Sequence, residues 1–321
     1  MTNIKKALNY QLFAEMNTQT TGTATLSDEM KTYYSDYLID NAQPKLVHDQ
    51  FGQKHPIPKN GGKTIEFRKY SPLPKLLTPL TEGVTPDGQS LTVTTVEATV
   101  EQYGGYVTLS DMLQLTAIDN NMVQATKLLG NQAGASLDTI TREVLNGGTN
   151  VVYAGGAASR SALTAENKLT VQDIKKAVRA LKTQNAEKIG DSFVGIIHPD
   201  VSFDLTNDPE WKDVKQYDPA DWYAGEIGKI AGVRFVETTE AKIFDGGVYS
   251  TLILGDNAYG VTEIEGGGLE HIVKQLGSAG TADALNQRAS CGWKATKVAE
   301  RLVEQFMVRI ESKSTFAGAQ N

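Results

Sequence analysis

The sequence predicts an α+β protein, and three features of its hydrophobic pattern carry that prediction. Two short runs alternate apolar and polar residues on either side of a proline-rich stretch, which is typical of a β-hairpin. A long proline-free region then repeats apolar residues every three or four positions, as a helix does. Further along, helical and strand-like patterns alternate, which indicates a module of helices packed on a sheet.

Length and composition are those of a folded, soluble protein. The chain has 321 residues, of which 40% are hydrophobic and 21% charged, so it can form one large domain or two closely joined ones. It carries 31 Lys and Arg against 38 Asp and Glu, a formal net charge of −7. A dedicated binder of nucleic acid or of an anionic membrane depends on a basic surface, so the charge balance argues against both classes.

The chain lacks the patterns of membrane insertion and of disulfide bonding. Its first residues contain no sustained apolar segment of the kind a signal peptide needs, and no run approaches 18 apolar residues. Cys291 is the only cysteine, which excludes an intrachain disulfide and a zinc site built from several thiolates. We therefore expect a cytosolic protein that is stabilised by packing or by assembly.

The first hundred residues predict an arm followed by a projecting hairpin. Residues 17–25 are almost wholly polar and should be extended unless a partner orders them. A helix from Ser27 should follow, and its aromatic stripe could dock on its own core or on a neighbouring subunit. Residues 64–70 and 91–100 then alternate as two strands joined by a long Pro/Gly-rich tip. Such a hairpin is marginal alone, so we expect it to lie against something else.

One long helix is predicted between Ser110, a plausible N-cap, and Asn146, which two glycines follow. At about 1.5 Å per residue, this helix would be roughly 50 Å long. Its apolar stripe consists of Ile118, Met122, Ala125, Leu129, Ala133, Leu137, Ile140 and Val144.

The region from about 165 to 265 reads as a compact α/β module. Thr170 and Asp173 form a variant of the capping box in front of a helix with a regular apolar face. Residues 192–198, 233–237 and 250–254 are short apolar or β-branched runs, which indicate buried strands. The final region, 288–312, keeps both helical and alternating spacing, so its residues alone leave helix and strand open.

The search for an active site assigns no catalytic, cofactor-binding or metal-binding residue. The four histidines show no metal-ligand spacing, and Gly61, Gly62 and Lys63 lack the upstream glycine and the following helix of a phosphate loop. His198 and Asp200, at the end of a predicted strand, are the best enzymatic pair. The favoured alternative is that Pro199 starts a helix and Asp200 lies in its first turn. Cys291 is expected to be buried and inert.

The chain resembles the major capsid proteins of tailed bacteriophages, in particular the family typified by the podophage called N four, which has the HK97-type capsid fold. The residues that carry this resemblance are 51–73 (FGQKHPIPKNGGKTIEFRKYSPL), 80–91 (LTEGVTPDGQSL), 98–111 (ATVEQYGGYVTLSD), 144–150 (VLNGGTN), 225–238 (GEIGKIAGVRFVET) and 254–260 (LGDNAYG).

The resemblance implies an organisation for the whole chain. It implies an N-terminal arm over 1–50, an extended E-loop over 51–107, a peripheral domain with a long spine helix over 108–164, an axial domain over 165–265, and a return to the peripheral domain over 266–321. For the ambiguous final region, the resemblance favours strands.

The implied function is that of a structural coat protein and not of an enzyme. Such a protein assembles with itself into hexamers and pentamers that form an icosahedral head enclosing double-stranded DNA. The resemblance implies no cofactor and no membrane, portal and scaffolding proteins as partners, assembly in the host bacterial cytoplasm, and a final place in the virion capsid. Arg68 and Lys69 on the hairpin are candidates for intersubunit contacts, with a solvated strand face as the alternative.

Two other functions remain open at this stage. An encapsulin-like cellular nanocompartment shell would share the fold and enclose a cargo enzyme. An α/β enzyme using His198 and Asp200 would require a pocket, and replacing His198 by alanine would then abolish its activity.

Overall fold

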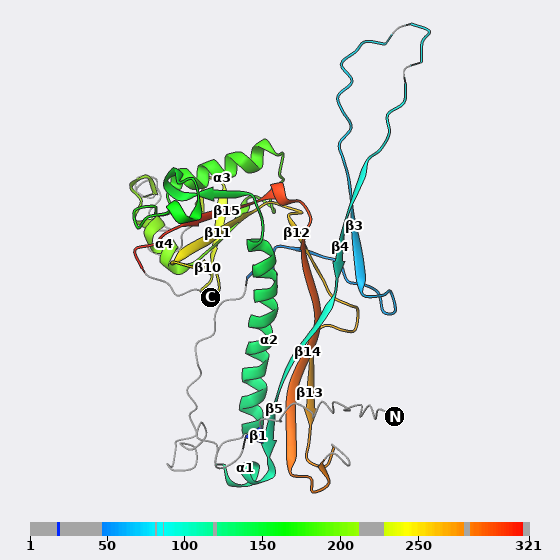
Figure 1. Cartoon of the computed structure of the whole chain (residues 1–321), viewed down its shortest axis with the longest axis vertical. Coiled ribbons are helices and arrows are strands. Elements are labelled where there is room, and N and C mark those ends of the chain that lie inside the picture. Colours follow the sequence, from blue (N-terminus) through cyan, green and yellow to red (C-terminus); the bar gives the residue numbers. More distant parts are fainter. Residues whose placement is uncertain are drawn as a thin grey trace, which may run out of the picture. The chain divides into compact units, whose positions relative to one another are not determined.

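The computed structural model describes residues 47–80, 82–85, 87–117, 121–211, 228–278 and 283–316, together with the short strand β1, Thr18–Gln19. The chain forms two compact units (Figure 1). Unit 1 contains residues 1–41, 104–133 and 269–294, and unit 2 contains residues 42–103, 134–268 and 295–321. Each unit is therefore built from segments that are far apart in the sequence.

A seven-stranded mixed sheet forms the centre of unit 2. In spatial order its strands are β6 (Val151–Tyr153), β15 (Met307–Ser312), β11 (Val248–Leu254), β7 (Phe193–Ile197), β9 (Val233–Glu237) and β8 (Lys229–Ile230), with β10 (Ile243–Phe244) paired to β11. The strands β7, β11 and β15 are buried along their whole length; β7 is apolar on both faces, whereas β15 also buries Arg309, Glu311 and Ser312.

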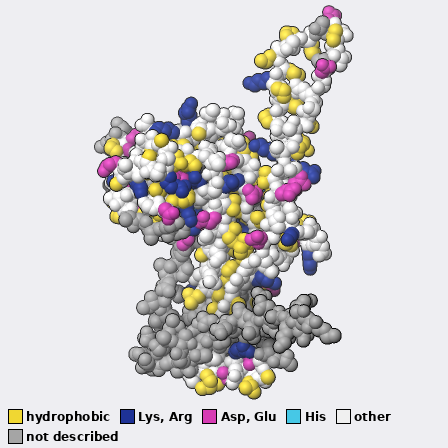
Figure 2. All heavy atoms as spheres, in the orientation of Figure 1, with side chains coloured by type: hydrophobic (Ala, Val, Ile, Leu, Met, Phe, Trp, Pro, Cys, Tyr) yellow, Lys and Arg dark blue, Asp and Glu magenta, His cyan; other side chains and the backbone are white. Residues whose placement is uncertain are grey.

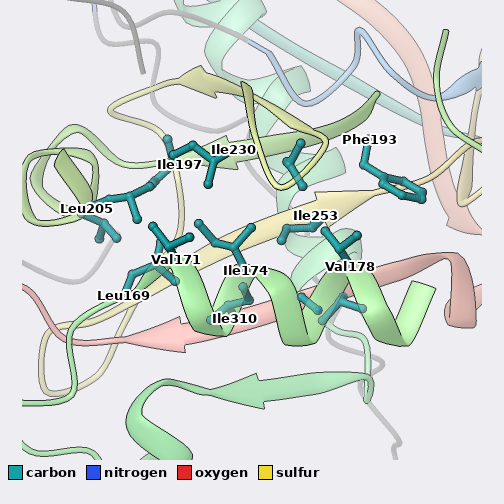
Figure 3. Packing of buried hydrophobic residues seen from close by; sticks show 14 of the residues in the cluster. Leu169, Val171, Ile174, Val178, Phe193, Ile197, Leu205, Ile230, Ile253 and Ile310 are labelled. Carbon is teal, nitrogen blue, oxygen red and sulfur yellow. The ribbon is translucent and has the colours of Figure 1, made fainter. Parts of the chain in front are cut away.

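Two helices cover one face of this sheet. They are α3 (Val171–Thr183) and α4 (Pro199–Thr206). Figure 3 shows Ile174 and Val178 of α3 packing toward Ile253 of β11 and Phe193 of β7. The predicted cap of α3 is confirmed, because the Thr170 hydroxyl accepts a hydrogen bond from the Asp173 amide at 3.3 Å.

The opposite face of the sheet carries a second core. It joins Ile196, Leu252 and Leu254 of the sheet to Leu145, near the end of a long helix, and to the buried Tyr259. The helix is α2, Asn121–Asn146, and its residues belong to both units. Both faces of the sheet are therefore covered, and this buries most of the strand residues in the module from about 165 to 265.

The hairpin predicted from the alternating runs is confirmed. Strands β3 (Thr64–Tyr70) and β4 (Val93–Thr99) pair antiparallel in a sheet of their own, with Thr64 opposite Thr99 and Tyr70 opposite Val93. Figure 1 shows the residues between them as a long open tip. Gly62, with φ of 87°, lies in the turn that enters β3, as expected for a turn and not for a phosphate loop.

A six-stranded sheet contains the remaining long strands. Its order is β1, β5 (Glu101–Ser110), β14 (Arg288–Arg301), β12 (Tyr259–Thr262) and β2 (Gln53–Lys54), with β13 (Glu270–Lys274) paired to β14. The final region, which was ambiguous in sequence, therefore consists of strands β14 and β15. The preference for strands that the resemblance implied is confirmed.

The prediction of a single long helix from Ser110 is wrong, because the region forms two helices. Ser110 does cap a helix, but this helix, α1, spans only Asp111–Thr116 and is separate from α2. Ala117, with extended backbone at ψ of 139°, ends α1. The sequence after Ala117 includes Asp119, Asn120 and Asn121, which are residue types that disfavour the interior of a helix. The predicted end at Asn146 is confirmed.

Other predictions fall partly outside the described residues. The helix expected from Ser27, most of the N-terminal arm and Ile118 lie there. Among the residues that the structure describes, no helix is long and apolar enough to cross a membrane.

Candidate assembly interface

The tip of the hairpin exposes a dense set of large apolar side chains. Leu76, Leu77 and Leu80 are 79%, 85% and 76% exposed. Tyr70, Leu73, Val84, Leu91 and Val93 are also exposed. Figure 2 shows apolar side chains repeated along this tip. A single exposed leucine is ordinary, but a concentration of them on one projecting element indicates an interaction surface.

The root of the hairpin is anchored to unit 2 by a few side chains. The Phe67 ring lies against Gly260, where an added Cβ would be 3.4 Å from the ring, and it meets the His55 ring edge-on at 5.7 Å. Ala98 is buried on the facing strand. A hollow of about 450 Å³ lies beside this anchor and is lined in part by Ile65, Phe67 and Leu302. The hairpin is thus fixed at its base and uncovered at its tip.

Arg68 and Lys69 lie on the exposed part of β3, and the structure brings neither into a buried contact. The Arg68 guanidinium is 3.6 Å from the Glu66 carboxylate, and both side chains are largely exposed. Lys69 is opposite Thr94, whose hydroxyl donates a hydrogen bond to the Lys69 carbonyl. An exposed pair of this kind contributes about 0–1 kcal/mol, so these charges are not needed to hold the hairpin.

The strongest enzymatic candidate, His198, has a structural role. It is the N-cap of α4, and its Nδ1 accepts a hydrogen bond from the Asp200 amide at 3.1 Å. Pro199 begins the helix, and the Asp200 carboxylate accepts a hydrogen bond from the Tyr249 hydroxyl at 2.6 Å. The favoured reading of this sequence as a helix start is confirmed.

Burial lowers the pKa of His198 below its usual value of 6.5, against an opposing effect from the Asp200 charge. Because the folded state favours the neutral ring, the cap stabilises the protein above pH 6.5 and loses this contribution as pH falls through the lowered pKa. We expect the ring-proton NMR titration of His198 to have its midpoint below 6.5.

A matched variant isolates this effect. His198→Asn keeps a side-chain acceptor at the N-cap but does not titrate. The free energy of unfolding of the wild type should therefore fall relative to this variant between pH 7 and pH 5. Parallel pH profiles would show that the cap is not sensitive to protonation, and an NMR midpoint above 6.5 would show that the fold favours the protonated ring; either result contradicts the prediction.

The other chemical candidates are also structural where the structure describes them. Cys291 is buried, and this burial raises the pKa of its thiol, which makes it a poor nucleophile. Within the described ranges, no group of three or more His, Cys, Asp and Glu side chains is placed to hold a metal ion.

A buried ionic cluster in unit 2 escaped the sequence analysis. The Glu311 carboxylate has no exposed surface and accepts two hydrogen bonds from Arg160, both at 2.7 Å, and one from Arg309 at 2.8 Å. The Arg160 guanidinium also lies 3.6 Å from the centre of the Phe244 ring. Arg309 donates to the carbonyls of Asn146 and Gly148, so the cluster joins the end of α2 to strand β15.

A second polar cluster fixes the segment that precedes the hairpin. The buried His48 Nδ1 is 2.7 Å from the Asp138 carboxylate, and the Tyr259 hydroxyl donates to the His48 carbonyl at 2.5 Å. Next to it, Asp49 pairs with Lys297, which also donates to the Leu137 carbonyl at 2.7 Å. These contacts hold residues 47–51 against α2 and β14 within unit 2 and so set where the hairpin begins.

A family model described as "Phage capsid protein" matches residues 93–300, which is more than half of the chain. The chain belongs to the phage capsid protein family. This match covers β4, the helices α2 and α3, and most of the strands described above. None of the curated proteins compared with the chain matches it.

Solved capsid structures share the fold over nearly the whole chain. The capsid of cyanophage P-SCSP1u is similar with a TM-score of 0.70 and 12% identity, covering 90% of this chain and 95% of that one. The cyanophage Pam1 capsid gives 0.68 and 13%, covering 91% and 98%, and the capsid of Ralstonia phage GP4 gives 0.66 and 13%, covering 90% and 96%. At these identities the likeness establishes the HK97-like fold.

Family and fold together make the chain a structural coat protein of a phage. In a coat protein, the apolar hairpin tip that is exposed in the single chain can contact other subunits. The helix-capping role of His198 is consistent with a structural protein. The narrower likeness to the N four group stays a prediction.

Proposed function

We propose that this coat protein assembles with itself into hexamers and pentamers that close an icosahedral head around double-stranded DNA. The observation that carries this proposal is the hairpin, whose tip exposes Leu76, Leu77 and Leu80 while its root is anchored in unit 2. A surface of this kind is stable in a phage head when a neighbouring copy covers it.

The physics of ring formation supports this arrangement. Identical subunits that join through two different surfaces make head-to-tail contacts, and such contacts close into rings when the rotation allows. The hairpin tip supplies one such surface. Burying a leucine side chain contributes about 1.5–3 kcal/mol, so several leucines per subunit would favour assembly strongly.

Arg68 and Lys69 would then contribute to partner selection at the same contact. Both side chains are exposed on β3, and charges at the rim of an interface affect association rate and register more than affinity. A reconstruction of the assembled particle tests this role by showing whether carboxylates of another copy lie within about 4 Å of them.

The remaining parts of the proposal follow from membership of the family. Portal and scaffolding proteins would be its partners, DNA would be enclosed without sequence-specific binding, and assembly would take place in the cytoplasm of the host bacterium. The segments 1–50, 51–107, 108–164, 165–265 and 266–321 would act as arm, E-loop, peripheral domain, axial domain and returning strands. The protein would have no catalytic role.

Purification of the protein expressed alone tests self-assembly. We expect sedimentation velocity and negative-stain electron microscopy to show rings, tubes or closed shells that form as concentration rises. A monomer or dimer at every concentration, which also fails to assemble when a scaffolding protein from the same phage is supplied, would contradict the proposed function.

A further inference from the structure

A cationic groove lies on the exposed side of α3, away from the hairpin. Lys175, Arg179 and Lys182 follow one another at helical spacing and are all exposed. The groove is a hollow of about 440 Å³ between this face and the turn joining β8 to β9. Its lining is completed by Val178, Thr183 and Ala231. Figure 2 shows Lys and Arg side chains on the body that contains α3.

The positive charge of the groove is only partly neutralised by the chain itself. Lys175 forms an exposed ion pair with Glu210. In the ranges that the structure describes, Arg179 and Lys182 form no ion pair with a carboxylate. The Thr183 hydroxyl donates to the Arg179 carbonyl and so does not engage the guanidinium. Among the described residues, these two cations therefore line the groove without a carboxylate partner.

We propose that this groove binds a carboxylate-bearing surface of a second copy of the chain. The inference rests on the proposed function and deepens it, since it names a contact between subunits that the hairpin does not make. A head-to-tail ring needs two unlike surfaces, and a basic groove that meets an acidic surface fulfils that requirement.

The composition of the groove favours a protein partner over DNA. Its lining includes the exposed Ala231 as well as Arg179, and arginine beside apolar contacts is typical of protein interfaces. A site for the DNA backbone depends on many cations and on a favourable long-range field. Here three cations stand on a chain with a net charge of −7, which repels DNA at a distance.

A second copy supplies the required carboxylates. The chain has seven more acidic than basic side chains, as 38 exceeds 31. Glu263 and Glu265, which follow β12, are exposed and form no ion pair within the described part of the chain. They show that acidic side chains are available on an element other than α3.

Zero-length cross-linking tests the contact directly. A carbodiimide joins a lysine amine to a carboxylate only when the two groups touch. We would assemble particles from equal amounts of ¹⁴N- and ¹⁵N-labelled protein, cross-link them and analyse the peptides by mass spectrometry. We expect Lys175 or Lys182 to be joined to a carboxylate peptide of the other isotope. Cross-links from these lysines only within one chain, such as to Glu210, would overturn the proposal.

A double charge reversal tests how much the contact made by the groove contributes to assembly. We expect Arg179→Glu/Lys182→Glu to lower the yield of assembled particles about tenfold or more, while the subunit stays folded by circular dichroism. Lys188→Glu/Lys229→Glu changes the net charge equally at exposed positions that do not line the groove, and it should assemble as the wild type does.

The other outcomes separate the competing explanations. Equal loss in both variants would assign the effect to net charge and overturn the proposal. Normal assembly of the groove variant, with reduced retention of a DNA duplex by its particles, would make DNA the occupant and overturn it as well. In both cases a wild type that still forms shells leaves the proposed function standing, whereas failure of the wild type itself would contradict that function.

Discussion

Replacing Glu311 by alanine should destabilise unit 2 by about 3–5 kcal/mol, because it leaves the buried Arg309 without its counter-charge. Glu311 is fully buried in β15, between β6 and β11, and accepts hydrogen bonds from two arginines. Arg309 is only 9% exposed, and this burial lowers the pKa of its guanidinium in spite of the Glu311 charge. Removal of the carboxylate would therefore expose the full cost of burying the cation.

Urea denaturation followed by circular dichroism measures this effect. Glu210→Ala is the matched control, because it breaks the exposed ion pair with Lys175 and should cost at most about 1 kcal/mol. A loss below about 1 kcal/mol for Glu311→Ala would mean that water or rearranged side chains solvate the arginines, and that the cluster does not hold α2 to the sheet.

The second large effect is expected at the hairpin tip. Changing Leu76, Leu77 and Leu80 together to serine should abolish assembly and leave the melting temperature of the free subunit unchanged. All three side chains are largely exposed in the single chain, so their replacement removes little that stabilises it. In a shell, each leucine buried on a neighbour would contribute about 1.5–3 kcal/mol.

Electron microscopy and sedimentation of the purified variant measure the loss of assembly. The triple change of the same leucines to methionine is the control, since methionine preserves the apolar area and should still allow shells to form. Normal assembly of the serine variant would show that the tip remains exposed in the particle, and the hairpin would then have no part in joining subunits.

The sequence predicted those elements whose signals are local. The alternation of Ile65 and Phe67 with polar neighbours is enough to define β3, and the Thr170 cap with its apolar helical face defines α3. The buried runs at β7 and β11 stand out because both faces of their sheet are covered, whereas β9, which was also predicted to be buried, buries only Val233. The prediction that Pro199 starts a helix with Asp200 in its first turn likewise depends only on local sequence, whereas the N-cap hydrogen bond of His198 was found only in the structure.

Features that depend on distant residues were not predictable in the same way. Glu311 meets Arg160 across 151 positions, and His48 meets Asp138 across 90, so no spacing in the sequence identifies either pair. The break between α1 and α2 depends on the backbone at Ala117, which the apolar periodicity does not report. The cationic groove on α3 combines a regular charged stripe with a turn near Ala231, and only the fold brings them together.

A cryo-electron microscopy reconstruction of particles assembled from the purified protein tests the central claim most directly. The claim is that this phage coat protein closes into a shell because each hairpin tip is covered by another copy. The account predicts rings of five and six subunits with Leu76, Leu77 and Leu80 buried on a neighbour. A hairpin that folds back on its own subunit, or tips that remain in solvent in a closed shell, would contradict it.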